Sequence, residues 1–255
     1  MPPFIFVCFT CTRDCDLLPL HFQAIRRAVP GAPVYYVYEM DDGEHAVVPA
    51  GSIKVLASFP HNGNLLGLKC HLGMLDTMRQ LSERNGGIPA IKIDSDVIFT
   101  KGDFLVSLGK EHDMVGAAPA RDYYCKGTCY GMTRPLISKV IAYLRKGYID
   151  LSDRLEDSTI SMVSALVSDA GKVKIHNAMN ADRTDVLYCM FNDQLRQYPD
   201  VIRSIKGFID CGDRLYTQHY DNPAAAKCEA MRYVTQVLLK HKKSGSPESD
   251  CRCRN

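Results

Sequence analysis

Residues 90–99 have the sequence AIKIDSDVIF, and we expect the rest of the chain to be organised around this stretch. β-Branched and aromatic residues flank the triplet Asp94-Ser95-Asp96 on both sides, which is typical of a buried strand. Two carboxylates are costly to bury without a cation, and a divalent metal ion with oxygen ligands is the natural partner. In one regular strand, Asp94 and Asp96 point to the same face and Ser95 points away. The alternative is an Asx turn at the end of a strand.

The composition is that of an ordinary globular protein. The 255 residues are 46% hydrophobic and 24% charged, and the net charge of +2 gives no reason to expect a nucleic-acid partner. The sequence shows neither a membrane-spanning apolar run nor the basic region of a signal peptide. We therefore expect a cytoplasmic protein whose eleven cysteines are free thiols. A zinc site at Cys8 and Cys11, or at Cys251 and Cys253, is the alternative use of these thiols.

Hydrophobic periodicity predicts strands and helices in alternation. The predicted strands are 4–10, 34–38, 53–59, 90–99, 113–119, 129–132, 172–176 and 201–209. The main predicted helices are 16–29, 65–83, 135–146, 155–167 and 223–241. This order is typical of a Rossmann-like α/β fold with a mixed, mainly parallel central sheet flanked by helices. In such a fold, ligands bind beyond the carboxyl ends of the strands.

One domain is expected to span residues 1–222, with a nucleotide-binding half at 1–100 and an acceptor half at 101–222. A C-terminal helix is predicted at 223–243, followed by a polar tail at 244–255 that we expect to be disordered. The basic end of that helix allows at most a weak peripheral contact with a membrane surface.

The order of the motifs resembles the nucleotide-sugar-dependent glycosyltransferases of the GT-A fold, such as the inverting family 2 enzymes. A β-α-β half leads to the D-x-D triplet, then to the small-residue segment Tyr130-Gly131-Met132, then to the acidic pair Glu156-Asp157. The resemblance implies an enzyme of the hexosyltransferase type that acts in polysaccharide or glycan assembly. Its donor would be a nucleotide-diphosphate sugar, with a UDP-sugar as first choice, and its acceptor a hydroxyl group of a glycan or lipid-linked molecule.

The resemblance also implies roles for the two acidic motifs. Asp94 and Asp96 would hold Mn²⁺ or Mg²⁺ on the donor diphosphate, with Ser95 beside the donor. Asp157, or else Glu156, would be the general base that deprotonates the acceptor hydroxyl, which gives inversion by single displacement. A third metal ligand is less obvious, and the candidates are His219, which we rank first, His176 and Asp210.

Further donor contacts are implied on the nucleoside side of the site. The first strand–helix junction would meet the base and ribose through Thr10, Thr12 and Arg13. Acidic residues after the second strand, Glu39 and Asp41, would lie against the nucleoside. Lys69, on the helix before the D-x-D triplet, falls on the predicted inward side of that helix, where a lysine more often extends to the edge of the packing than points into a cleft. The resemblance implies that Lys69 reaches the donor.

Several alternatives remain open. Glu156 fits the third helical position of a capping box that begins at Asp153, and Asp157 fits an N-cap. If neither residue is the base, a retaining mechanism becomes the candidate. A sugar-phosphate nucleotidyltransferase is the second enzyme class, although the junction after the first strand lacks the glycine-rich basic loop typical of such enzymes. The third hypothesis for the function is a non-catalytic protein that binds a sugar nucleotide.

Overall fold

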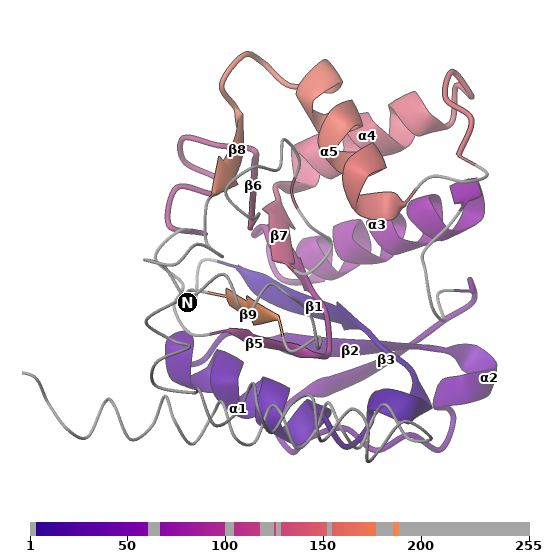
Figure 1. The fold of residues 1–255 in the computed structure, drawn as a ribbon, viewed down its shortest axis with the longest axis vertical. Helices are drawn as coiled ribbons and strands as arrows, with labels where there is room; N and C mark the ends of the chain where they lie inside the picture. Colours follow the sequence, from indigo (N-terminus) through magenta and orange to yellow (C-terminus); the bar gives the residue numbers. More distant parts are fainter. Residues whose placement is uncertain are drawn as a thin grey trace, which may run out of the picture.

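A seven-stranded sheet forms the centre of the molecule (Figure 1). The computed structural model describes residues 4–60, 67–99, 105–117, 125, 129–151, 155–176 and 186–188. The strand order is β3-β2-β1-β4-β7-β6-β8. The strands are β1 (Ile5–Phe9), β2 (Val34–Glu39), β3 (Ile53–Ala57), β4 (Ala90–Ile93), β6 (Met114–Ala117), β7 (Cys129–Met132) and β8 (Val173–His176). Only β7 runs against the others, so the predicted mixed, mainly parallel sheet is confirmed.

Helices cover both faces of this sheet (Figure 1). One face carries α3 (Gly67–Arg84), α4 (Arg134–Leu144) and α5 (Glu156–Val167), and the other carries α1 (Leu18–Ala28). Alternate residues of β1 serve the two faces, since Val7 packs in the core below α3 while Phe6 packs in the core below α1. Burial on both faces explains why these strands are continuous apolar runs in the sequence.

The stretch 90–99 is not the single strand that the sequence predicted. β4 ends at Ile93, and Asp94-Ser95-Asp96 forms a turn in which the backbone N–H of Val97 donates to Asp94 O at 3.2 Å. The chain then enters β5 (Val97–Phe99), which leaves the main sheet and pairs with β9 (Val186–Tyr188). Val97 and Phe99 of β5 are buried in the core below α1, where the Phe99 ring meets the Phe6 ring edge to face. Asp94 and Asp96 therefore lie in a turn, and the predicted placement of both side chains on one face of a regular strand is wrong.

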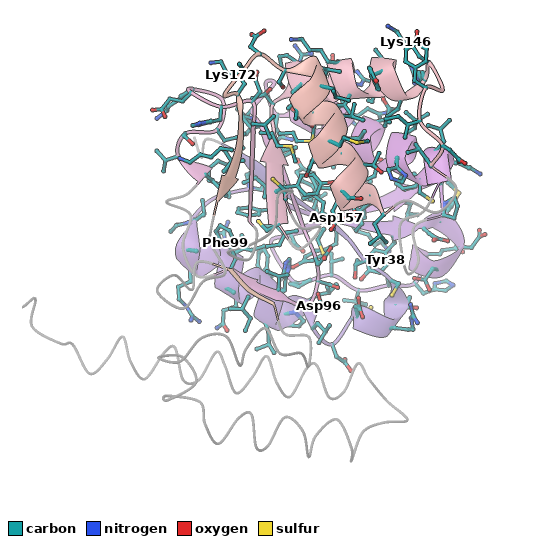
Figure 2. All side chains as sticks on the ribbon, turned by 45° about the horizontal axis from the view of Figure 1, so that its top comes forward. Tyr38, Asp96, Phe99, Lys146, Asp157 and Lys172 are labelled. Atoms are coloured by element: carbon teal, nitrogen blue, oxygen red, sulfur yellow. The ribbon has the colours of Figure 1, made fainter. Side chains whose placement is uncertain are left out.

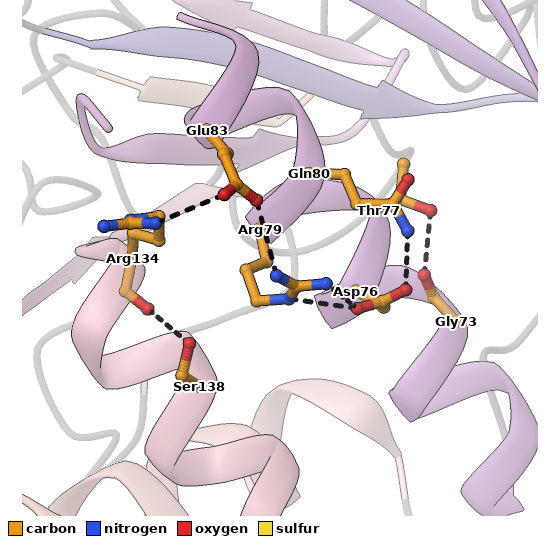
Figure 3. Close-up of polar contacts among 8 residues, drawn as sticks. All are labelled: Gly73, Asp76, Thr77, Arg79, Gln80, Glu83, Arg134 and Ser138. Carbon is orange, nitrogen blue, oxygen red and sulfur yellow. Dashed lines mark hydrogen bonds and ion pairs between the residues drawn. The ribbon is translucent and has the colours of Figure 1, made fainter. Parts of the chain in front are cut away.

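The ion pairs within α3, and the one that joins α3 to α4, lie at the surface (Figure 3). Arg79 pairs with Asp76 at 2.8 Å and with Glu83 at 3.5 Å, and Glu83 also meets Arg134 of α4 at 3.6 Å. Exposed pairs of this kind contribute about 0–1 kcal/mol each. The two helices are held mainly by buried apolar side chains such as Met78 of α3 and those of α4.

Several predictions lie outside the described residues. These are the strand at 201–209, the helix at 223–243 and the tail at 244–255, so the predicted domain limits stay predictions. Within the described part of the chain, no helix has both the length and the apolar character needed to cross a membrane. The six cysteines in that part are free thiols, as predicted for them.

His21 makes the stability of the fold depend on pH. Its ring is fully buried, with Nδ1 2.9 Å from the hydroxyl of Tyr36, and burial lowers its pKa from 6.5 to about 3. Between these values the unfolded chain binds a proton that the folded chain excludes. The free energy of unfolding should therefore fall by about 1.4 kcal/mol per pH unit below pH 6 because of this residue. Urea titrations at pH 7, 6 and 5 should show a shallower decline in His21→Gln. The matched variant of the exposed His45, His45→Gln, should keep the wild-type decline, and an equal decline in both variants would contradict the assignment.

Candidate functional site

The candidate site lies at the carboxyl edge of the sheet, where the chain order changes direction. β1 is followed in sequence by β2 on one side, and the chain returns through α3 to place β4 on its other side. In open α/β sheets, this switch point is the usual location of a ligand site. Polar residues follow the ends of β1, β2 and β4 at this edge. Side-chain hydrogen bonds link the residues after one strand to those after the neighbouring strand.

A buried lysine forms the centre of these links. Lys92 of β4 is 3% exposed, and its Nζ lies 2.5 Å from Asp94 Oδ1 and 3.3 Å from Glu156 Oε1. The hydroxyl of Tyr130 on β7 donates to the same Glu156 Oε1 at 3.2 Å. We call Lys92, Asp94, Tyr130 and Glu156 the Lys92 cluster. It joins the D-x-D turn to the acidic start of α5, the two motifs to which the resemblance gives roles in the same reaction.

The charges of the Lys92 cluster perturb one another. Burial disfavours the ammonium form of Lys92, but the nearby carboxylates of Asp94 and Glu156 outweigh burial and raise its pKa. Burial also raises the pKa of Asp94, with Lys92 acting against the shift and the charges of Glu156 and Asp157 adding to it. The pKa of Tyr130 is raised by burial and by its contact with Glu156. The carboxylates around Lys92 therefore hold it as a cation in spite of its burial.

Both members of the acidic pair lie in the first turn of α5. The N-cap is Leu155, which offers no side-chain cap, so Glu156 and Asp157 are the first two helical residues. The two capping interpretations are therefore wrong in their positions, although Asp153 itself lies outside the described residues. Glu156 is 7% exposed and Asp157 is half-buried. Figure 2 labels Asp157 beside the first turn of α5 and Asp96 beside β5.

A second link joins the D-x-D turn to the end of β1. Ser95 is 5% exposed, and its hydroxyl donates to Asp14 Oδ2 at 2.7 Å. Asp14 belongs to the short 3-10 helix η1 (Thr12–Asp14) that follows β1. The sequence predicts a place for Ser95 beside the donor and no role for Asp14. A carboxylate in the junction after the first strand was the available signal, but its partner is 81 residues away.

A third link joins the ends of β1 and β2. Asp42 of the short helix α2 (Met40–Gly43) accepts from the backbone N–H of Thr12 at 2.8 Å and from its hydroxyl at 2.6 Å. The predicted nucleoside contacts were Glu39 and Asp41. Glu39 is half-buried as the N-cap of α2, while Asp41 is exposed and Asp42 is the residue that meets Thr12. The α2 helix, which the sequence did not predict, places Asp42 rather than Asp41 against Thr12.

The remaining predicted donor contacts differ in their surroundings. Thr10 is buried at the end of β1, and its N–H donates to Val37 O. Arg13 is exposed, and contact with the Cys11 side chain raises its pKa. Lys69 is also exposed, so its predicted place on the inward side of α3 is wrong. The buried face of α3 begins with His71 and continues through Met74 and Met78.

The oxygen ligands of the D-x-D turn suit a hard divalent cation. Asp96 is 6% exposed and the Asp94 side chain is 31% exposed, so the turn offers two carboxylates of different accessibility. Among the described residues, no three His, Cys, Asp or Glu side chains gather as a metal site. Of the predicted third ligands, His219 and Asp210 lie outside the described residues. His176 is the last residue of β8. Two strands, β7 and β6, separate β8 from β4, the strand that leads into the D-x-D turn.

Comparison with known proteins gives only distant similarities. No family model matches the chain, and no curated protein matches its sequence. Among solved structures, a glycosyltransferase involved in glycosylation of the major capsid of PBCV-1 is similar at 11% identity and a TM-score of 0.48, over 77% of this chain and 88% of that one. The galactosyltransferase LgtC, solved with donor and acceptor sugar analogues, gives 11% identity and a TM-score of 0.42, over 69% and 74% of the two chains.

A third similar structure is the glycosyltransferase GlyE of Streptococcus pneumoniae TIGR4. It gives 12% identity and a TM-score of 0.41, over 68% of this chain and 45% of that one. At these scores the similarities decide neither the fold family nor the activity of this chain.

The bond between Ser95 and Asp14 should stabilise the protein measurably. A partly buried hydrogen bond to a carboxylate contributes about 1.5–3 kcal/mol. In a double-mutant cycle of Ser95→Ala and Asp14→Ala, urea unfolding should give a coupling energy of at least about 1 kcal/mol. Thr77→Ala is the matched control, because the Thr77 hydroxyl donates only within α3 (Figure 3). Additive effects of Ser95→Ala and Asp14→Ala would contradict the link.

Proposed function

We propose that this protein is a metal-dependent glycosyltransferase of the GT-A type. It transfers a sugar, with inversion, from a nucleotide-diphosphate sugar to a hydroxyl group of a glycan or lipid-linked acceptor. A UDP-sugar is the first choice of donor. The observation that carries the proposal is the Lys92 cluster, because it brings the D-x-D turn and the Glu156-Asp157 pair together from positions 62 residues apart in the sequence (156 − 94).

The donor site is proposed at the carboxyl ends of β1, β2 and β4. Asp94 and Asp96 suit Mn²⁺ or Mg²⁺ by the chemistry of their oxygens, and the bound ion would stabilise the charge of the departing diphosphate. The η1 turn and α2 supply the surface for the nucleoside, with Thr12 and Asp42 already bonded to each other there. The Ser95–Asp14 bond fixes the D-x-D turn against this surface.

The acceptor hydroxyl needs a base because a neutral hydroxyl is a poor nucleophile. In the proposed reaction, its oxygen bonds to the anomeric carbon of the donor while the bond from that carbon to the diphosphate oxygen breaks. The hydroxyl proton passes to Asp157, and the nucleoside diphosphate leaves with the electron pair. The half-buried position of Asp157, next to the Lys92 cluster, supports this role.

Isothermal titration with nucleoside diphosphates tests the proposal. UDP, GDP, CDP and TDP would each be titrated with and without Mn²⁺ into the wild type and Asp96→Ala. One nucleotide should bind in a metal-dependent way, and Asp96→Ala should weaken that binding at least about tenfold, which equals about 1.4 kcal/mol. Loss of a metal-binding oxygen is the physical reason.

Asp76→Ala is the matched control for this titration. Asp76 is a carboxylate on the surface of α3, where it pairs with Arg79, so its removal should leave nucleotide binding unchanged (Figure 3). Binding that ignores both Mn²⁺ and Asp96, or no binding of any of the four nucleotides, would contradict the proposed function.

A further inference from the structure

The two carboxylates at the start of α5 differ in their surroundings. Glu156 is buried, and its Oε1 receives both the ammonium of Lys92 and the hydroxyl of Tyr130. Asp157 is half-buried, and its Oδ1 accepts from the N–H of Ser158 at 2.6 Å. The two adjacent acidic residues therefore differ in burial, and Glu156 is bonded to residues of β4 and β7.

Glu156 is poorly placed to take a proton from a substrate. A general base needs a free lone pair within hydrogen-bond reach of the acceptor hydroxyl. The oxygen Oε1 already accepts from donors on β4 and β7. Only 7% of the residue is exposed, so an acceptor hydroxyl has little access to its carboxylate. Glu156 is instead suited to attach the first turn of α5 to the sheet.

Attachment of this turn also determines where Asp157 lies. The two residues are consecutive in a helix, so fixing the side chain of Glu156 fixes the direction in which the next side chain leaves the helix. The charge of Asp157 adds to the raised pKa of both Asp94 and Tyr130, in accord with its place one residue after Glu156. A helical N-terminus also favours an anionic side chain at that position.

We propose that Lys92 and Glu156 are positioning residues, and that Asp157 alone of the acidic pair contacts substrate. Lys92 and Tyr130 bind Glu156, Glu156 holds the start of α5 against β4 and β7, and α5 presents Asp157 to the donor site. This inference rests on the proposed function for the role of Asp157, whereas the Lys92–Glu156 attachment is independent of it.

The attachment is tested by stability. Lys92→Met and Glu156→Gln should each change the equilibrium constant for unfolding. The fold-change in the double variant should differ at least tenfold from the product of the two single fold-changes. Lys92→Met with Asp157→Asn is the matched comparison and should be multiplicative within about threefold. If Lys92→Met does not fold, Tyr130→Phe replaces it in the same two cycles. Equal coupling of Lys92 or Tyr130 to both acidic residues would overturn the assignment.

The roles in turnover are tested by the pH dependence of UDP release from UDP-glucose and UDP-galactose with Mn²⁺ present. Asp157→Asn should lower kcat by about 10²–10⁴-fold and remove the acidic limb of the pH profile. Glu156→Gln should lower kcat by about tenfold or less, with the acidic limb kept and KM little changed. Loss of the acidic limb in Glu156→Gln would overturn the proposal.

The two experiments separate the inference from the proposed function. If neither sugar nucleotide is turned over or bound, the proposed function fails for these donors while the stability cycles still decide whether Glu156 is held by Lys92. If turnover occurs but the Lys92–Glu156 effects are multiplicative, the function stands and the positioning role is wrong.

Discussion

An ammonium group inside a sheet must be matched by negative charge, and this requirement of Lys92 governs the arrangement at the carboxyl edge of the sheet. Its strand is buried on both faces, so water cannot solvate the charge. Asp94 and Glu156 are the matching carboxylates, one from the turn after β4 and one from α5. The turn and the helix are thus held together by the need to neutralise one buried cation.

The other links extend this arrangement along the edge in the order of the strands. Asp42 and Thr12 join β2 to β1, Asp14 and Ser95 join β1 to β4, and the Lys92 cluster joins β4 to β7 and α5. Each link crosses from one strand end to its neighbour in the sheet. A site built in this way is organised before a ligand arrives, which reduces the conformational entropy that binding must remove.

The sequence predicted the fold better than the site. Buried strands such as β1 and β2 are apolar runs whose type is unambiguous, and most helices followed their periodicity. The D-x-D region was predicted as one strand because its apolar flanks are continuous, and no local pattern reveals the bond of Ser95 to Asp14 at the turn. Lys92 was visible as a cation in a buried strand, but its second partner, Glu156, depends on the tertiary fold. The roles of Asp94, Asp96 and Asp157 remain predictions.

The central claim is that one site contains both acidic motifs. The most direct test is a crystal structure of the protein with UDP and Mn²⁺, with the metal located by its anomalous scattering. We expect a single strong Mn²⁺ peak bonded to an oxygen of Asp94 or Asp96, with the diphosphate on the metal and Asp157 facing the same space. A metal or nucleotide bound elsewhere on the molecule, with the D-x-D turn unliganded, would show that the proposed site is wrong.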